Sequence, residues 1–154
     1  MAEVYENIIH ERVAMANRGE NKNAIIKMKS GWLVLGDNQI ISGYCILLAD
    51  PVVESINVLE KQKREQFLMD MTIVGDVLLK TLNPQQINYM ILGNSDKCLH
   101  AHIHPRYEYE REEYRKRPPF IYDFNREPEK LFDYERDKEL IYIIKNEIEK
   151  IFVL

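Results

Sequence analysis

Three histidines at alternate positions limit, more than any other feature, what this chain can fold into. His100, His102 and His104 lie in the run Cys98-Leu-His-Ala-His-Ile-His-Pro-Arg-Tyr107, and the whole sequence contains only four histidines. Successive side chains of a β-strand point to opposite faces, so a strand here places Cys98 and the three histidines on one face. The residues of its other face are Leu99, Ala101 and Ile103. These apolar side chains suit a core, and the pattern therefore predicts a strand that carries a row of imidazoles.

The row of imidazoles has three interpretations. Imidazole titrates near neutral pH, so one histidine can attack phosphorus while its neighbours hold the phosphate oxygens and the leaving group. Alternate strand residues can also converge on a Zn²⁺ ion that takes three protein ligands and a water. The third interpretation is a solvated strand face that is rich in histidine and has no chemistry. Spacing alone leaves all three open. Pro105 has no N–H, and we expect it to end the strand.

Neighbouring segments resemble a known family. The run Ile87-Asn-Tyr-Met-Ile-Leu-Gly-Asn94, followed by Leu99-His-Ala-His-Ile-His-Pro-Arg-Tyr107, resembles the histidine-triad superfamily of nucleotide hydrolases and transferases, in particular its bacterial diadenosine tetraphosphate hydrolase-like branch. The motif of that family is His-φ-His-φ-His-φ-φ, often followed by Pro-Arg. Residues 30–48 resemble the nucleoside-binding hairpin of the family and its Pro-Gly-His-like turn, and the resemblance covers residues 24–107.

The resemblance assigns roles to the histidines in one of two registers. Anchoring on Pro105 and Arg106 makes Cys98 the first motif position and His100 the second, whereas the literal triplet makes His102 the second. In the family the second histidine is the nucleophile and forms a nucleotidyl-histidine intermediate. The first register also places Asn94 where the family carries a phosphate-binding glutamine. We therefore expect His100 to be the nucleophile and His102 to donate to the α-phosphate, with His104 at the end of the strand.

The chain departs from the family pattern at several positions. Cys98 stands where the first histidine is usual, Asn94 is one methylene shorter than glutamine, and Tyr44 replaces the turn histidine. Asp37 and Asn38 are the nearest candidates for the ribose-binding residue. The expected substrate-binding residues are Asn94, Asp37, Asn38, Cys98, His104 and Arg106, beside the catalytic His100 and His102, with no metal ligands among them.

Composition limits the class of protein. The chain has 154 residues, 45% of them hydrophobic, which is enough for about one domain with its own core. The net charge of −4 argues against nonspecific nucleic-acid binding. Two distant cysteines without CxxC spacing are typical of a reduced compartment. No secretory signal and no apolar run of about 20 residues is evident. We expect a cytoplasmic protein that binds neither nucleic acid nor membrane.

Apolar periodicity predicts the order of helices and strands. Helices are expected over 3–17, 57–81 and 127–152, and strands over 24–28, 32–35, 44–49, 87–92 and 99–104. This order indicates an α+β fold with an antiparallel sheet, flanking helices and a C-terminal helical extension, as in the histidine-triad proteins. Residues 1–107 would form the nucleotide-binding domain. Residues 108–154, a charged segment followed by an amphipathic helix, would belong to the same domain.

The C-terminal segment has two open alternatives. Its helix either docks on its own domain or forms the interface of a homodimer, as the resemblance implies. A basic cluster precedes that helix and consists of Arg111, Arg115, Lys116 and Arg117. It either reaches over the cleft toward polyphosphate or is a solvated charge run.

These observations lead to one main hypothesis. The resemblance implies hydrolysis of a nucleotide phosphoanhydride or phosphoramidate, with a nucleotide or dinucleoside polyphosphate as the ligand. No cofactor is expected to be required, although Mg²⁺ can accompany a polyphosphate. The alternatives are a nucleotide-binding regulatory module with little turnover and a metal site ligated by the histidines.

Overall fold

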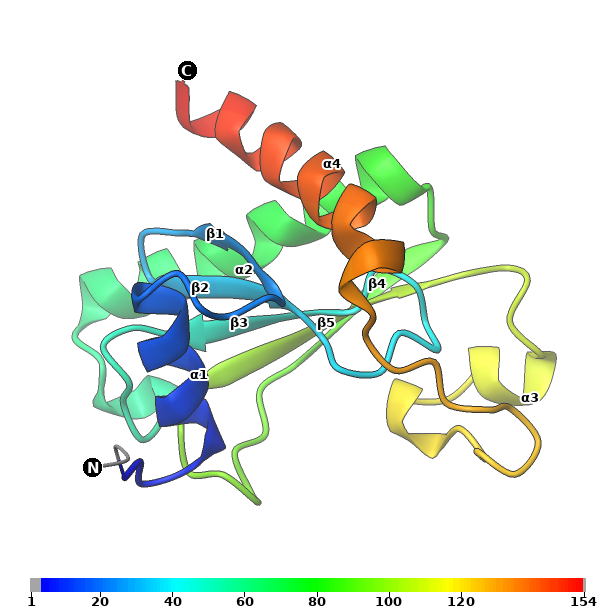
Figure 1. Ribbon diagram of the computed structural model, residues 1–154, viewed down its shortest axis with the longest axis horizontal. Helices are drawn as coiled ribbons and strands as arrows, with labels where there is room; N and C mark the ends of the chain where they lie inside the picture. Colours follow the sequence, from blue (N-terminus) through cyan, green and yellow to red (C-terminus); the bar gives the residue numbers. More distant parts are fainter. Residues whose placement is uncertain (1–3, 154) are drawn as a thin grey trace.

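The computed structural model describes residues 4–153 and folds them around a five-stranded antiparallel sheet (Figure 1). The strands are β1 (Ala24–Lys27), β2 (Gly31–Leu35), β3 (Cys45–Ala49), β4 (Gln86–Met90) and β5 (His100–Arg106), arranged β1-β2-β3-β5-β4. The helices are α1 (Ile8–Asn17), α2 (Lys61–Leu82), α3 (Glu112–Arg115) and α4 (Tyr134–Val153), with 3₁₀ turns η1 (Ile56–Val58) and η2 (Pro119–Ile121). This architecture confirms the predicted α+β fold.

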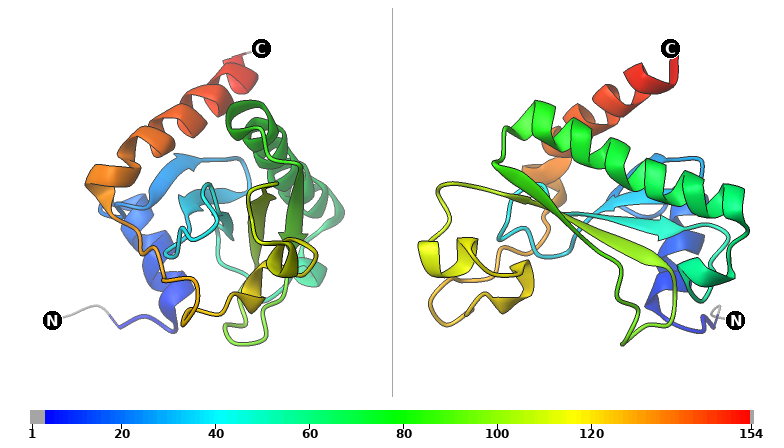
Figure 2. Two further views of the ribbon diagram at one scale, coloured as in Figure 1. Left: turned by 90° about the vertical axis from the view of Figure 1, so that its right-hand side faces the viewer. Right: turned by 180° about the vertical axis from the view of Figure 1, so that it is seen from behind.

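The two faces of the sheet are covered by different helices. Helices α2 and α4 lie on one face, and α1 lies on the other (Figure 1, Figure 2). Strand alternation divides the core accordingly: Leu47 and Ala101 point to the α2 side, whereas Ile46 and Leu48 point to the α1 side. Apolar side chains on both faces explain why β3 is fully buried along its length. The sheet is therefore a central layer, with a large core on the side of α2 and α4 and a smaller core on the side of α1.

Strand β5 extends further than the sequence analysis predicted. Pro105 does not end the strand, because the pairing with β4 continues to Arg106 opposite Gln86. The carbonyl of Arg106 accepts from Gln85 on the β4 side, so the nitrogen of Pro105 faces the other side. There the pairing with β3 has already ended, at Cys45 opposite Ile103. The missing N–H therefore leaves no ladder partner unsatisfied.

Helix boundaries also differ from the prediction. Helix α1 begins at Ile8 behind the capping residue Asn7, and residue 3 lies outside the described residues. Helix α2 begins at Lys61 because the preceding residues form the turn η1. Helix α4 begins at Tyr134 instead of residue 127. The residues before it are held in an extended conformation, with Lys130 accepting from Gln39 and Phe132 donating to Asp37 through their backbones.

The C-terminal helix docks on its own domain. Ile144 and Ile148 of α4 are fully buried in the core that α2 shares with the sheet. The homodimer stays a prediction. Within residues 4–153, no helix has both the length and the apolar character that crossing a membrane requires.

The segment between β5 and α4, residues 107–133, forms an arm that extends away from the sheet (Figure 1, Figure 2). It carries α3 and η2, neither of which the sequence analysis predicted. The arm returns to the domain at a β-bridge between Leu131 and Asn38. It therefore connects the end of the histidine strand with the turn between β2 and β3.

Candidate active site

The histidine row lies on the α1 side of the sheet. In the register of β3 and β5, His100 is opposite Leu48 and His102 is opposite Ile46, both of which point to that side. The intervening residues Ala101 and Ile103 are completely buried in the larger core. The predicted division of the strand into an apolar face and an imidazole face is confirmed.

His100 has a defined ring orientation. Its Nδ1 is 2.7 Å from the backbone carbonyl oxygen of Cys98, and only 8% of the residue is exposed. A carbonyl oxygen can only accept a hydrogen bond, so Nδ1 must carry the proton. In the neutral ring, the lone pair is then on Nε2. His100 is therefore prepared to act as a nucleophile through Nε2.

His102 contacts a tyrosine from the turn before β3. Its Nδ1 is 2.6 Å from Oη of Tyr44, and its ring meets that of His100 edge-on with 4.9 Å between centroids. Burial, and secondarily the neighbouring His100, lower the pKa of His102 to about 4. Burial likewise raises the pKa of Tyr44 well above its usual value of 10. Both groups are therefore uncharged at neutral pH.

His104 is packed among aromatic rings. It stacks on Tyr44 with 3.9 Å between centroids and an interplanar angle of 8°, and Phe120 of the arm meets its ring edge-on. Burial, followed by the charges of His102 and Arg106, lowers the pKa of His104 to about 3. Phe120 also meets the edge of His102, so the arm reaches two of the three histidines.

These low pKa values predict how stability depends on pH. The unfolded chain protonates its histidines near pH 6.5, whereas the folded protein keeps His102 neutral down to about pH 4 and His104 down to about pH 3. The free energy of unfolding is therefore fully present above pH 6.5 and falls as the pH decreases toward 4. His104→Asn removes one of the two contributions and makes this dependence shallower by up to about 1 kcal/mol per pH unit.

Urea unfolding of His104→Asn at about pH 5 and 7.5, compared with wild type, measures that difference. Thr72→Ala, a change of an exposed, non-titrating side chain in α2, is the control and should keep the wild-type slope. An identical pH slope in wild type and His104→Asn would contradict the burial argument.

Cys98 is anchored to the start of α1. Its Sγ accepts a hydrogen bond from Nδ2 of Asn7 at 3.0 Å, and Nδ1 of His10 is 3.8 Å away. The Oδ1 of Asn7 caps α1 by accepting from the backbone of Ile9 and His10. Cys98 thus connects the helix to the strand, and its own carbonyl orients His100.

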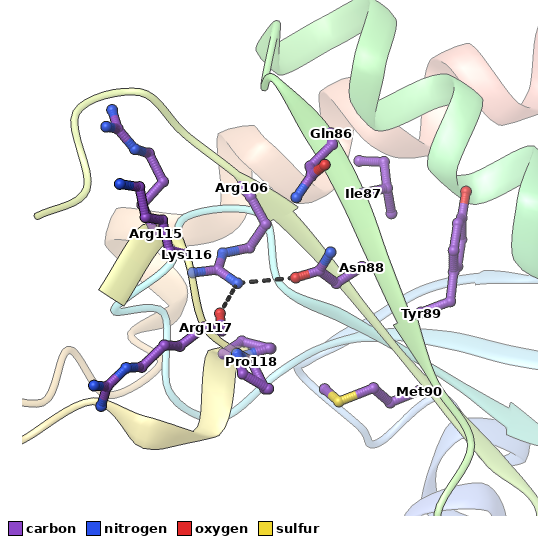
Figure 3. Close-up of a pocket in the computed structure, with 11 residues that line it drawn as sticks. Gln86, Ile87, Asn88, Tyr89, Met90, Arg106, Arg115, Lys116, Arg117 and Pro118 are labelled. Atoms are coloured by element: carbon purple, nitrogen blue, oxygen red, sulfur yellow. Dashed lines mark hydrogen bonds between the residues drawn. The ribbon is translucent and has the colours of Figure 1, made fainter. Parts of the chain in front are cut away.

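Arg106 is bound entirely within the protein. The residue is only 1% exposed. Its guanidinium donates to Glu110 through Nε and Nη2, to Oδ1 of Asn88, and to the carbonyls of Tyr114 and Arg117. Figure 3 shows the bonds to Asn88 and Arg117. Glu110 also accepts from the backbone of Tyr107 and from Oη of Tyr122. This buried network fixes the arm to the end of β5.

The other predicted binding residues lie around the row at different places. Asn94 is exposed in the loop between β4 and β5, and among residues 4–153 no hydrogen bond joins it to the histidines. Asp37 pairs with Arg12 and accepts from Nδ2 of Asn23. The side chain of Asn38 accepts from the backbone of Ile40 and of Lys130 in the arm.

A pocket of about 460 Å³ lies between β4 and the arm (Figure 3). Met90 pairs with His102 and Asn88 with His104, so these β4 side chains share the histidine face. The wall opposite β4 contains Arg115, Lys116 and Arg117. Three residues of the predicted basic cluster therefore line a cavity whose β4 wall contains the strand partners of His102 and His104.

Sequence reasoning missed the contacts that join distant segments. The sequence does not indicate Phe120, because one aromatic residue in a charged loop has no periodic signal. It indicates Tyr44 only as a replacement in the turn. A metal site ligated by the histidines would require several ligands that converge on one point. Within residues 4–153, no group of three or more His, Cys, Asp or Glu side chains could hold a metal ion.

Solved structures of histidine-triad proteins are similar to this chain. A histidine triad protein from Marinobacter aquaeolei is 16% identical and has a TM-score of 0.72, with 92% of this chain and 95% of that chain covered. A hypothetical histidine triad nucleotide-binding protein from Sulfolobus tokodaii is 16% identical with a TM-score of 0.69, and 91% and 92% of the two chains are covered.

A diadenosine triphosphate hydrolase from Plasmodium falciparum is also similar. It is 16% identical and has a TM-score of 0.57, with 84% of this chain and 78% of that chain covered. No family model and no curated protein matches the sequence. At these identities the shared property is the fold.

Proposed function

This chain has the histidine-triad fold, and from that premise we propose that it is a nucleotide hydrolase that works through a nucleotidyl-histidine intermediate. The observation that carries the proposal is the hydrogen bond from Nδ1 of His100 to the Cys98 carbonyl. It leaves the Nε2 lone pair available on the imidazole face of β5. The tautomer also supports the register in which His100 is the second motif histidine.

The proposed reaction has two displacements. Nε2 of His100 attacks the α-phosphorus, the P–N bond to histidine forms, and the bond to the leaving group breaks with its electron pair. Water then attacks the same phosphorus, releases the nucleoside monophosphate and returns the electron pair to Nε2. His102 stabilises the charge on the phosphate oxygens as a hydrogen-bond donor. These steps use side chains and water, and Mg²⁺ enters only as the counterion of a polyphosphate.

The pocket between β4 and the arm supports a dinucleoside polyphosphate as the substrate. Its lining includes Asn88 and Met90, the strand partners of His104 and His102, together with Arg115, Lys116 and Arg117, whose charge suits the distal phosphates of such a molecule. The similarity of the fold to a diadenosine triphosphate hydrolase is consistent with such a substrate. An adenosine phosphoramidate has no distal phosphates and would use the histidines alone.

A comparison of two substrates tests this proposal. We expect turnover of both diadenosine tetraphosphate and adenosine phosphoramidate. Lys116→Ala/Arg117→Ala should lower kcat/KM for the tetraphosphate by about tenfold, since each exposed charge contributes up to about 1 kcal/mol, and leave the phosphoramidate unaffected. Lys138→Ala/Lys145→Ala removes the same charge from α4 and is the matched control. Equal losses for both substrates would contradict the assigned pocket.

A second candidate function is a regulatory module that binds nucleotide and turns it over slowly. The observation that favours it is Cys98 at the first motif position, where the family has a histidine. Tight nucleotide binding without product over hours would select this alternative. Absence of both binding and turnover would reject both candidates.

A further inference from the structure

Tyr44 approaches His102 in a way that determines where the histidine proton lies. The 2.6 Å contact between Oη of Tyr44 and Nδ1 of His102 needs one donor. An imidazole nitrogen accepts much more strongly than a phenol oxygen, and no other described acceptor bonds to this phenol. The phenol O–H therefore donates to Nδ1. In the neutral ring, the proton of His102 is then on Nε2.

The ring of Tyr44 is held on both sides. His104 stacks on it with 3.9 Å between centroids and nearly parallel planes. Gly36 contacts it as well, since a Cβ at Gly36 would be 2.2 Å from Cδ1 of Tyr44. Gly36 has no positive φ, so the close approach of the ring, and not the backbone conformation, requires a residue without a side chain.

We propose that Tyr44, clamped between Gly36 and His104, is a positioning residue that fixes His102 as a donor through Nε2–H. Only the predicted effect of Tyr44 on kcat rests on the proposed function; the tautomer of His102 does not. Two neighbouring imidazoles then have opposite tautomers: His100 offers a lone pair at Nε2, and His102 offers a proton at Nε2. His104 acts in this arrangement by packing against Tyr44.

The charge states of Tyr44 and His102 are consistent with a hydrogen bond from the phenol to Nδ1. The pKa of His102 is lowered to about 4, mainly by burial, and burial raises that of Tyr44. An uncharged phenol beside an uncharged imidazole permits one strong hydrogen bond in a single direction. His102 therefore assists the reaction as a neutral donor and not as an imidazolium.

Nitrogen NMR of the folded protein with ¹⁵N-labelled histidine tests the tautomers without any substrate. We expect the His100 proton on Nδ1 and the His102 proton on Nε2 at neutral pH, with assignments from His100→Gln and His102→Gln spectra. A His102 proton on Nδ1 in wild type would overturn the proposal by itself. Because this result needs no variant of Tyr44, it remains decisive if such variants fold poorly.

Two variants connect the tautomer to catalysis. Tyr44→Phe keeps the ring on His104 and removes only the hydroxyl, and we expect a mixture of His102 tautomers and a roughly tenfold lower kcat with little change in KM. Gly36→Ala displaces the ring and should give the same two changes. Tyr107→Phe is the matched control, because it loses a phenol hydrogen bond of the same 2.6 Å length, to the carbonyl of Ser42.

The outcomes separate this inference from the proposed function. If NMR shows the expected tautomers but the protein turns over no nucleotide, the role of Tyr44 toward His102 stands and the proposed hydrolase activity is rejected. Normal turnover together with unchanged kcat in Tyr44→Phe would retain the hydrolase and overturn the positioning role. A decrease in Tyr107→Phe as large as in Tyr44→Phe would also overturn it, since the effect would then come from lost stability of the turn.

Discussion

His100→Ala is expected to lower kcat by at least about 10³-fold with both nucleotide substrates, because it removes the atom that forms the covalent intermediate in the proposed mechanism. The fold should persist, since among residues 4–153 the imidazole makes one hydrogen bond, to the Cys98 carbonyl. His102→Ala removes one hydrogen-bond donor to the phosphate oxygens and should cost about 10²-fold. Steady-state rates and circular dichroism of both variants provide the measurement.

Chemical rescue identifies which histidine is the nucleophile. His100→Gly leaves a space in which added imidazole can attack the α-phosphorus, so imidazole should restore turnover and release a nucleoside phosphorimidazolide. His102→Gly should not respond, since its missing group donates a hydrogen bond and forms no bond to phosphorus. Rescue of His102→Gly alone would move the nucleophile by two residues to the literal middle histidine.

Arg106→Met is expected to destabilise the protein by about 3–5 kcal/mol. The change leaves the carboxylate of Glu110 buried without its cation, and both side chains are 3% exposed or less. It also removes the donors to the carbonyls of Tyr114 and Arg117 that hold the arm. Chemical denaturation of the variant measures the loss. Lys138→Ala is the control. It removes the exposed partner of Glu135 and should change stability by less than about 1 kcal/mol.

A double variant separates charge from packing at this site. Arg106→Met/Glu110→Leu removes the unpaired carboxylate as well as the guanidinium. It should be more stable than Arg106→Met by at least about 1 kcal/mol, because the buried charge is no longer present. A double variant that is less stable than the single one would show that Glu110 is held by its other donors and needs no cation.

The histidine strand could be predicted because its signal is local. Alternation of His100, Ala101, His102 and Ile103 fixes both the strand and its two faces, and the structure confirms both. The long helix over residues 57–81 carries an apolar stripe and is observed as α2. Pro105 does not mark the end of the strand, because the cost of a missing N–H depends on whether a neighbouring strand is present at that position.

The surroundings of the row could not be predicted because they join residues distant in sequence. Tyr44 and His102 are 58 residues apart, and no pattern within either segment indicates that they meet. Phe120 reaches the histidines only because the network of Arg106 fixes the arm, and two acceptors in that network are backbone carbonyls. Carbonyls are present at every residue, so a sequence does not identify them.

Capture of the covalent intermediate tests the central claim most directly. Excess enzyme is mixed with diadenosine tetraphosphate, quenched within one turnover in alkali, where a phosphorus–nitrogen bond to histidine survives, and the digested peptides are analysed by mass spectrometry. We expect one nucleoside monophosphate group attached to His100. Attachment to His102, or active turnover with no modified histidine at any time, would contradict it.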